Sequence, residues 1–167
     1  MYMKTYVSSL GLITMTSDGE NLTGLWFENQ KYFGGKYDLR EAKPCGEQRD
    51  IFQKVEKWLD DYFKAIPRSN SEIPVKPVGT DFQQKVWKIL MDIPYGETIT
   101  YGEIGKLIEK DSGKRVSAQA VGNAVGRNPI SIIIPCHRVI GSDGSLKGYA
   151  GGIDRKKKLL EMEAFSK

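Results

Sequence analysis

Residues 67–79 interrupt the chain between two regions whose patterns of apolar residues differ. The segment holds Pro67, Pro74, Pro77 and Gly79 around a Ser-Asn-Ser stretch, and such residues favour turns and extended backbone over helix. Short β-type runs and one helical pattern precede it, whereas mainly helical spacing follows it. A chain of 167 residues has room for one ordinary domain or two small ones that share a core. The sequence therefore predicts two domains, residues 1–75 and residues 76–167.

The first domain is predicted to be a small sheet covered by one helix. Residues 6–7, 10–13 and 22–27 are short β-type runs, and turn residues between the last two indicate a hairpin. Residues 51–63 place apolar side chains at spacings of one, three and four, which form one face of an α-helix. Asp50 is the predicted N-cap of that helix. These features favour an α/β (α+β) fold.

The second domain is predicted to be mainly helical. Its apolar residues recur at helical spacing in segments separated by turns rich in Pro, Gly and polar residues. Two short helices joined by a polar loop at residues 111–115 resemble a helix-turn-helix. Residues 130–134 are too apolar to be exposed, and a glycine-rich loop spans residues 147–152. The predicted helices begin near Thr80 or Asp81, near Thr100, near Ser117 and near Asp154.

Charge is distributed unevenly along the chain. Residues 1–100 contain 13 Lys+Arg and 14 Asp+Glu, a net of −1, whereas residues 101–167 contain 12 and 7, a net of +5. A basic half suits a polyanion such as DNA, although a solvated basic surface explains the same numbers. No apolar stretch is long enough to cross a bilayer, and the N-terminus lacks a signal-peptide pattern. The sequence predicts a cytoplasmic protein that makes no membrane contact.

Cys45 and Cys136 are the only cysteines, and His137 is the only histidine. A structural zinc site usually takes four Cys or His ligands, so no metal is predicted, and a disulfide is disfavoured in a reducing compartment. Cys136 beside His137 has the residue types of a nucleophile and its base, although a buried structural pair is the alternative. Neighbouring side chains diverge, so a water would carry the proton, and Glu161 or Glu163 could orient the imidazole.

Several ordered segments resemble the O6-alkylguanine-DNA alkyltransferase family. Pro135-Cys136-His137-Arg138-Val139 is similar to the active-site signature of that family, and Asn128-Pro129 precedes it at the family's spacing. The resemblance is strong over residues 80–163 and only general over residues 1–75. The other matching segments are Phe82 to Trp87, Ile93 to Tyr101, Gly148 to Gly152 and Leu159 to Glu163.

The resemblance implies a fold and a reaction. The fold is a small ribonuclease H-like N-terminal domain with a structural role, then a mainly helical C-terminal domain with a winged-helix-like helix-turn-helix. The reaction is direct-reversal DNA repair, in which the alkyl group of O6-methylguanine moves from a flipped-out base of double-stranded DNA to Cys136, once per molecule. O4-methylthymine is a further candidate substrate. The resemblance implies a monomer that needs no cofactor.

The resemblance also implies roles for individual residues. Cys136 accepts the alkyl group, His137 is its water-relayed base, and Glu163 orients His137. Asn128 braces the active-site turn, while Tyr101 crowds the target phosphate and donates a proton to the departing guanine. The residues implied to bind DNA or the flipped base are Gln119, Tyr101, Arg127, Arg138, Val139, Tyr149, Ala150 and Gly151, with main-chain groups supplied by Val139 and Ala150.

Two of these positions carry further expectations. Gln119 stands where many members of the family have arginine, which predicts weaker DNA affinity with the chemistry retained. Lys114 and Arg115 in the neighbouring loop either compensate for that charge or are simply solvated. Arg138 fits a structural role as well as it fits contact with DNA.

Three other functions fit part of the sequence. A lesion-binding protein without transfer activity would resemble family relatives that have tryptophan at the position of Cys136. A helix-turn-helix regulator of transcription leaves the Cys-His turn unexplained. A Cys-dependent hydrolase requires turnover, and its histidine rarely follows the cysteine directly.

Overall fold

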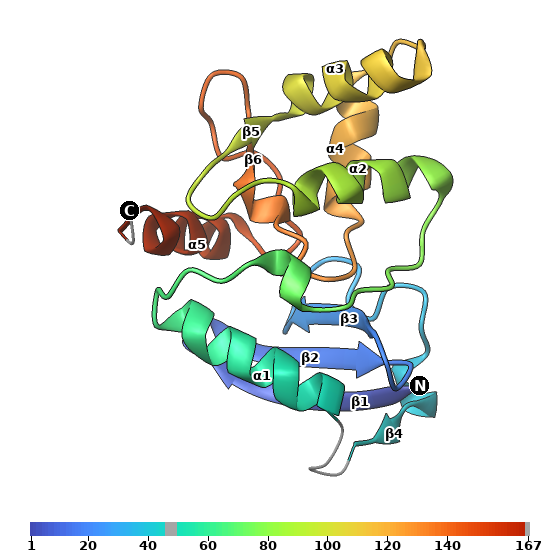
Figure 1. The fold of residues 1–167 in the computed structure, drawn as a ribbon, viewed down its shortest axis with the longest axis vertical. Helices are drawn as coiled ribbons and strands as arrows, with labels where there is room; N and C mark the ends of the chain where they lie inside the picture. Colours follow the sequence, from blue (N-terminus) through green and yellow to red (C-terminus); the bar gives the residue numbers. More distant parts are fainter. Residues whose placement is uncertain (46–49, 166–167) are drawn as a thin grey trace.

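The computed structural model of the chain describes residues 1–45 and 50–165, arranged as a sheet with one covering helix and a helical layer beside it (Figure 1). The elements in chain order are β1 (Tyr2–Ser8), β2 (Gly11–Ser17), β3 (Leu22–Phe27), η1 (Leu39–Glu41), β4 (Lys43–Pro44), α1 (Asp50–Phe63), η2 (Asn70–Glu72), α2 (Asp81–Met91), β5 (Ile99–Thr100), α3 (Tyr101–Ser112), α4 (Ala118–Gly126), η3 (Cys136–Arg138), β6 (Val139–Ile140) and α5 (Ile153–Phe165). The mixed fold predicted from the sequence is confirmed.

The N-terminal sheet has the strand order β3-β2-β1-β4. Its first three strands are antiparallel, and β4 runs parallel to β1. The predicted hairpin joins β2 to β3, and the Asp18 carboxylate accepts from the N–H groups of Glu20 and Asn21 in its turn. The apolar face of α1 packs on β1 and β2, as its spacing predicted. Asp50 is the first residue of α1 rather than its N-cap, and the N-cap position lies outside the described residues.

The helices of the C-terminal half begin where polar side chains satisfy their first N–H groups. Thr80 and Thr100 each take part in a capping box, and the Ser117 side chain accepts from the Ala120 N–H. The helix α3 extends through Ser112, so the polar loop is shorter than predicted. The helices α2, α3 and α4 pack on one another, and α3 and α4 form the predicted helix-turn-helix. Beside them, β5 and β6 form a two-residue parallel pair in place of a wing hairpin.

The segment predicted as a linker is pinned to the N-terminal sheet. The Leu22 N–H donates to the Pro74 carbonyl at 2.8 Å, and the Lys76 N–H donates to the Leu22 carbonyl at 2.8 Å. These bonds cover the outer edge of β3, which would otherwise expose unpaired peptide groups. No α-helix forms in this segment, which holds only the single 3-10 turn η2, but the segment is a structural part of the sheet edge and not a loose connection.

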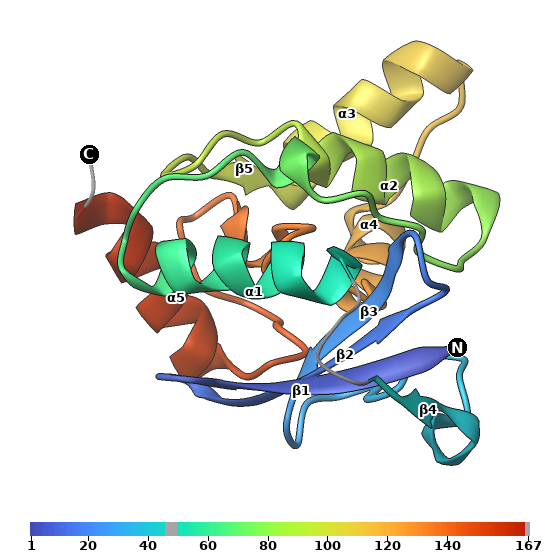
Figure 2. The same ribbon diagram turned by 60° about the horizontal axis from the view of Figure 1, so that its bottom comes forward.

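The last helix connects the two halves from the other side. In both views α5 lies at the opposite side of the molecule from α3 (Figures 1 and 2), and it packs against η3. Arg155 donates from α5 to the carbonyls of Leu10 and Glu28 at 2.9 and 3.0 Å. Within residues 1–45 and 50–165, no helix has the length and apolar character to span a membrane. No disulfide links Cys45 and Cys136.

Candidate active site

The apolar run at residues 130–134 forms a buried turn against the edge of the N-terminal sheet. The Leu25 N–H in β3 donates to the Pro129 carbonyl at 2.9 Å, and the Ser131 N–H donates back to the Leu25 carbonyl at 2.9 Å. Ile132 has a φ of 71°, in the left-handed region that is costly for a β-branched residue. The turn therefore depends on support from the residues around it.

Two buried asparagines supply that support. Asn128 donates through Nδ2 to the Ile134 carbonyl at 2.7 Å, and its Oδ1 accepts from the Ile130 N–H at 3.0 Å. Asn70, from the N-terminal half, donates through Nδ2 to the carbonyls of Ile132 and Ile133. The position of Asn128 fits the bracing role implied by the resemblance. Sequence reasoning missed Asn70, because an asparagine in a Ser-Asn-Ser stretch reads as a solvated loop residue.

Cys136 lies at the end of this turn, where it begins η3, and is only 4% exposed. Burial raises the pKa of the thiol to about 11, although a hydrogen bond with Asn128 and the positive charge of Lys156 act in the opposite direction. At neutral pH the resting protein therefore holds Cys136 as the neutral thiol. Nucleophilic attack by this sulfur requires a base that removes the proton.

His137 is fully buried and is paired with Glu163, the one of the two candidate carboxylates on α5 that faces it. Nε2 of His137 lies 2.7 Å from Oε1 of Glu163, whereas Glu161 is exposed. A carboxylate only accepts, so this network assigns the hydrogen to Nε2 and leaves a lone pair on Nδ1. Among the described residues Nδ1 has no hydrogen-bond partner. Burial lowers the pKa of His137, so the imidazole is neutral and able to accept a proton.

Arg138 lies inside the protein, which favours its structural role over the contact with DNA. Its Nε donates to both oxygens of Glu163 at 3.0 and 3.2 Å, its Nη2 donates to Oε1 at 2.9 Å, and its Nη1 donates to the Ile93 carbonyl at 2.7 Å. Burial alone would raise the pKa of Glu163, but the hydrogen bonds from His137 and Arg138 and the positive charge of Arg138 hold it well below its usual range. The guanidinium neutralises a buried carboxylate instead of a phosphate.

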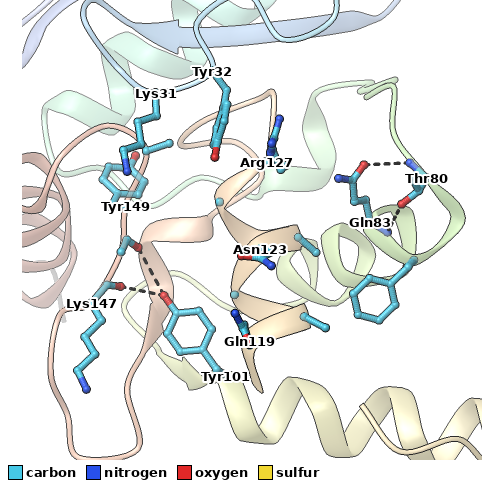
Figure 3. A pocket seen from close by; sticks show the side chains of 17 residues that line it. Lys31, Tyr32, Thr80, Gln83, Tyr101, Gln119, Asn123, Arg127, Lys147 and Tyr149 are labelled. Atoms are coloured by element: carbon cyan, nitrogen blue, oxygen red, sulfur yellow. Dashed lines mark hydrogen bonds between the residues drawn. The ribbon is translucent and has the colours of Figure 1, made fainter. Parts of the chain in front are cut away.

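A cleft of about 870 Å³ lies between α4, the glycine-rich loop and residues 31–32 of the N-terminal half (Figure 3). Three cationic side chains line it, Lys31, Arg127 and Lys147, and none of its lining residues is Asp or Glu. This charge suits a polyanion. The cleft brings together five of the residues implied to bind DNA or the flipped base: Tyr101, Gln119, Arg127, Tyr149 and Ala150.

Two tyrosines connect the cleft with Cys136. Burial and then the charge that Cys136 would carry as a thiolate raise the pKa of both Tyr101 and Tyr149. The Tyr101 hydroxyl donates to the Lys147 carbonyl at 2.9 Å and so holds the glycine-rich loop. Gly151 is not part of the cleft lining. A Cβ at that position would lie 2.7 Å from Cε1 of Tyr149, so Gly151 acts by letting the tyrosine ring pack.

Val139 also lies away from the cleft surface. It is fully buried, and its N–H donates to the Cys136 carbonyl at the end of η3. The resemblance implied that main-chain groups of Val139 contact the flipped base. Because its N–H is already bonded to Cys136, only its carbonyl could make that contact.

Sequence reasoning missed three further residues around the cleft. The Lys31 N–H donates to the Ala150 carbonyl at 2.9 Å, and the Arg127 guanidinium carbon lies 3.8 Å from the centre of the Tyr32 ring. Lys156 is buried, and its Nζ donates to the Lys147 carbonyl at 3.1 Å. Lys31 and Tyr32 belong to a loop without a recognisable pattern. Lys156 is one of four consecutive basic residues, and spacing alone does not distinguish the buried one.

The chain matches two family models and many known proteins over nearly its whole length. The 6-O-methylguanine DNA methyltransferase, ribonuclease-like domain, matches residues 1–77, and the DNA binding domain of the same family matches residues 81–165. The methylated-DNA--protein-cysteine methyltransferase of Methanosarcina mazei is 49% identical over 166 residues, which cover 98% of this chain and 97% of the relative. The protein of that name from Haemophilus influenzae is 42% identical, with 98% and 86% covered.

The fold agrees with these sequence matches. The crystal structure of Mycobacterium tuberculosis OGT in complex with DNA superposes with a TM-score of 0.87 at 41% identity, covering 99% of this chain and 94% of that chain. Sequence and fold thus match across both halves, including the segment that holds the Cys-His turn and its buried glutamate. The chain therefore belongs to the 6-O-methylguanine DNA methyltransferase family.

Proposed function

We propose that the chain repairs O6-alkylguanine in double-stranded DNA by direct reversal, with Cys136 as the alkyl acceptor and one transfer per molecule. The observation that carries this proposal is a buried, neutral thiol beside a neutral histidine whose Nδ1 is unpaired among the described residues. A thiol in this state reacts slowly with small reagents in solution. It suits a substrate that is drawn into the protein through the neighbouring cationic cleft.

The reaction is a single displacement at the alkyl carbon. The Cys136 proton passes through a water molecule to Nδ1 of His137, and the sulfur lone pair forms the S–C bond as the C–O6 bond breaks. Tyr101 donates its hydroxyl proton to the departing guanine, and the resulting phenolate and imidazolium exchange protons with water. Glu163 orients the imidazole and stabilises the imidazolium. The thioether product resists hydrolysis, which explains a single turnover.

The DNA contacts follow from the position of the cleft. A base inside the duplex hides its O6 group, so the target nucleotide has to rotate out, at a cost of a few kcal/mol. The helix-turn-helix would lie in the minor groove, with exposed Gln119 at the start of α4 filling the gap in the stack. Arg127, Lys31 and Lys147 would neutralise phosphates around the cleft.

Three coarser properties complete the proposal. Residues 1–75 and 76–167 form the two domains, the protein acts as a monomer, and it works in the cytoplasm. These inferences rest on the composition, the linker pattern and the position of the cleft on a single chain.

The test is mass spectrometry of the intact protein and its peptides after mixing with duplex DNA that carries O6-methylguanine. We expect one methyl group per molecule, located on Cys136, with no gain for Cys136→Ser and full gain for the control Cys45→Ser. A second duplex with O4-methylthymine defines the substrate range. Lesion binding without a mass gain would identify a recognition protein, and repeated turnover would identify a hydrolase.

A further inference from the structure

A buried tyrosine of the N-terminal half touches the His137–Glu163 pair. Tyr62 lies on α1 and is fully buried. Its hydroxyl oxygen lies 2.8 Å from Oε1 of Glu163 and 3.4 Å from Nε2 of His137. The same carboxylate oxygen thus receives both the imidazole and the phenol.

The direction of these bonds follows from the charges. The pKa of Glu163 is held at about 2, so the carboxylate is ionised and only accepts. Burial, and then the negative charge of Glu163, raise the pKa of Tyr62 well above its usual range, so its hydroxyl keeps its proton and donates. Arg138 donates to both oxygens, through Nη2 to Oε1 at 2.9 Å and through Nε to Oε2 at 3.0 Å, and the Gly96 N–H donates to Oε2 at 3.2 Å.

The Tyr62 ring is held by packing that does not depend on its hydroxyl. It stacks on Trp58 with ring centres 5.3 Å apart and an angle of 8° between the planes. Its edge meets Tyr95 and His137, with ring centres 6.1 and 6.5 Å apart. A phenylalanine at this position would therefore keep the ring contacts and remove only the hydroxyl, with its contacts to Glu163 and His137.

We infer that Tyr62 is a positioning residue for proton transfer from Cys136, because its hydroxyl holds the Glu163 carboxylate in the orientation that keeps His137 protonated on Nε2 and open on Nδ1. This inference rests on the proposed function, in which His137 takes the thiol proton. It gives the N-terminal half a direct part in the chemistry of the site, beyond structural support.

The Tyr62 hydroxyl also affects the pKa of the His137 imidazole. A carboxylate that loses a donor becomes more basic and stabilises an imidazolium more strongly, which raises the histidine pKa. Among the described residues, the other charged groups that act on His137 are Glu163 and Lys156 on α5 and Arg138 on η3, and Cys136 is its neighbour in the chain. All of these remain in Tyr62→Phe, so a change in the titration of His137 reports the hydroxyl.

The first experiment measures single-turnover methyl transfer from O6-methylguanine duplex across pH 5 to 10 for wild type and Tyr62→Phe. We expect Tyr62→Phe to lower the rate constant about tenfold at pH 7, which is a fraction of the roughly 10²–10⁴-fold that general bases contribute. We also expect the acidic side of its pH–rate profile to move to higher pH. Tyr6→Phe is the matched control, because it also removes a tyrosine–carboxylate bond, at 2.7 Å to Asp60, but away from the site. An unchanged rate and pH profile in Tyr62→Phe would overturn the inference.

The second experiment uses the fact that His137 is the only histidine of the chain. Imidazole 15N NMR gives its tautomer and titration without assignment. We expect the Nε2–H tautomer in wild type and an upward shift of the titration in Tyr62→Phe. A wild-type Nδ1–H tautomer overturns the inference even if the variant fails to fold. If wild type does not methylate Cys136, the proposed function fails while the NMR titration still tests Tyr62.

Discussion

Replacing Glu163 with glutamine tests the buried charge network at its centre. The carboxylate accepts from His137, Tyr62 and Arg138, and both Glu163 and Arg138 are buried. Glu163→Gln keeps the shape of the side chain but removes its charge. The guanidinium of Arg138 is then left as a buried cation without a counter-charge, which is among the most destabilising consequences that a single substitution has.

The magnitude follows from two independent lines. Breaking a buried ion pair by removing one partner costs about 3–5 kcal/mol. The pKa of Glu163 falls from an ordinary 4.5 to about 2 in the folded protein, and at about 1.4 kcal/mol per unit this corresponds to about 3.5 kcal/mol. Because the folded pKa is lowered, this stability is fully present above about pH 4.5 and is lost as the pH falls through about 2. For 167 residues, the loss corresponds to a melting temperature lowered by about 10 °C.

Urea denaturation followed by circular dichroism, at pH 7 and in steps from pH 5 to pH 2, measures the effect. We expect Glu163→Gln to be less stable by about 3–5 kcal/mol at pH 7, with a gap to wild type that narrows toward pH 2. The matched control is Glu161→Gln on the same helix, whose exposed pair with Lys157 at 4.0 Å is worth less than about 0.5 kcal/mol. A variant within about 1 kcal/mol of wild type at pH 7, or a gap that stays constant with pH, would refute the reasoning.

Three further predictions concern the turn, the DNA face and the thiol. Asn128→Ala leaves buried peptide groups of the turn unpaired and should lower the free energy of unfolding, measured in urea, by about 3 kcal/mol. The exposed control Asn123→Ala should change it by less than about 0.5 kcal/mol, and equal effects would contradict the bracing role of Asn128. Gln119→Arg should tighten binding to duplex DNA, measured by fluorescence anisotropy, and the slope of log affinity against log salt concentration should become steeper by about one. An unchanged slope would show that residue 119 does not contact phosphates. Lys156→Met removes a cation that lowers the pKa of Cys136, so alkylation of Cys136 by iodoacetamide should require higher pH than in wild type; the same shift in exposed Lys158→Met would rule out a specific effect of Lys156.

Patterns that are local in sequence predicted most of the secondary structure. The helical face of residues 51–63 and the caps at Thr80, Thr100 and Ser117 depend on residues within one or two turns of one another. The short strands β4, β5 and β6 were not predicted, because two residues carry no periodicity. The attachment of the supposed linker to Leu22 was also missed, since main-chain pairing with a distant strand leaves no trace in side-chain pattern.

The residues of the candidate site were likewise predicted only in part. Residue types alone indicated Cys136 and His137 with Glu161 or Glu163, whereas the resemblance selected Glu163 and added Asn128. The structure brings Cys136, His137, Glu163 and Asn128 together around one turn. The sequence left a structural role and a DNA contact open for Arg138, because the carboxylate that neutralises it lies 25 residues further along the chain.

Tyr62 and Asn70 were missed for a related reason. An aromatic residue on an apolar helical face indicates core packing, and a serine-flanked asparagine indicates a loop. Their partners lie 101 and 62 residues away in the chain, at Glu163 and Ile132. Only the tertiary fold brings them to the site.

The left-handed backbone of Ile132 sets a limit on how far the two halves are interchangeable. Its carbonyl and that of Ile133 are held by Asn70, which belongs to the half that carries no nucleophile. A hybrid gene that joins the first 77 residues of one relative to the remainder of another would have to preserve this amide, or the loop before the cysteine would relax to ordinary dihedral angles. Exchange of modules between members of the family is thus constrained by the amide of residue 70, together with the other contacts that join the two halves, such as that of Tyr62 with Glu163.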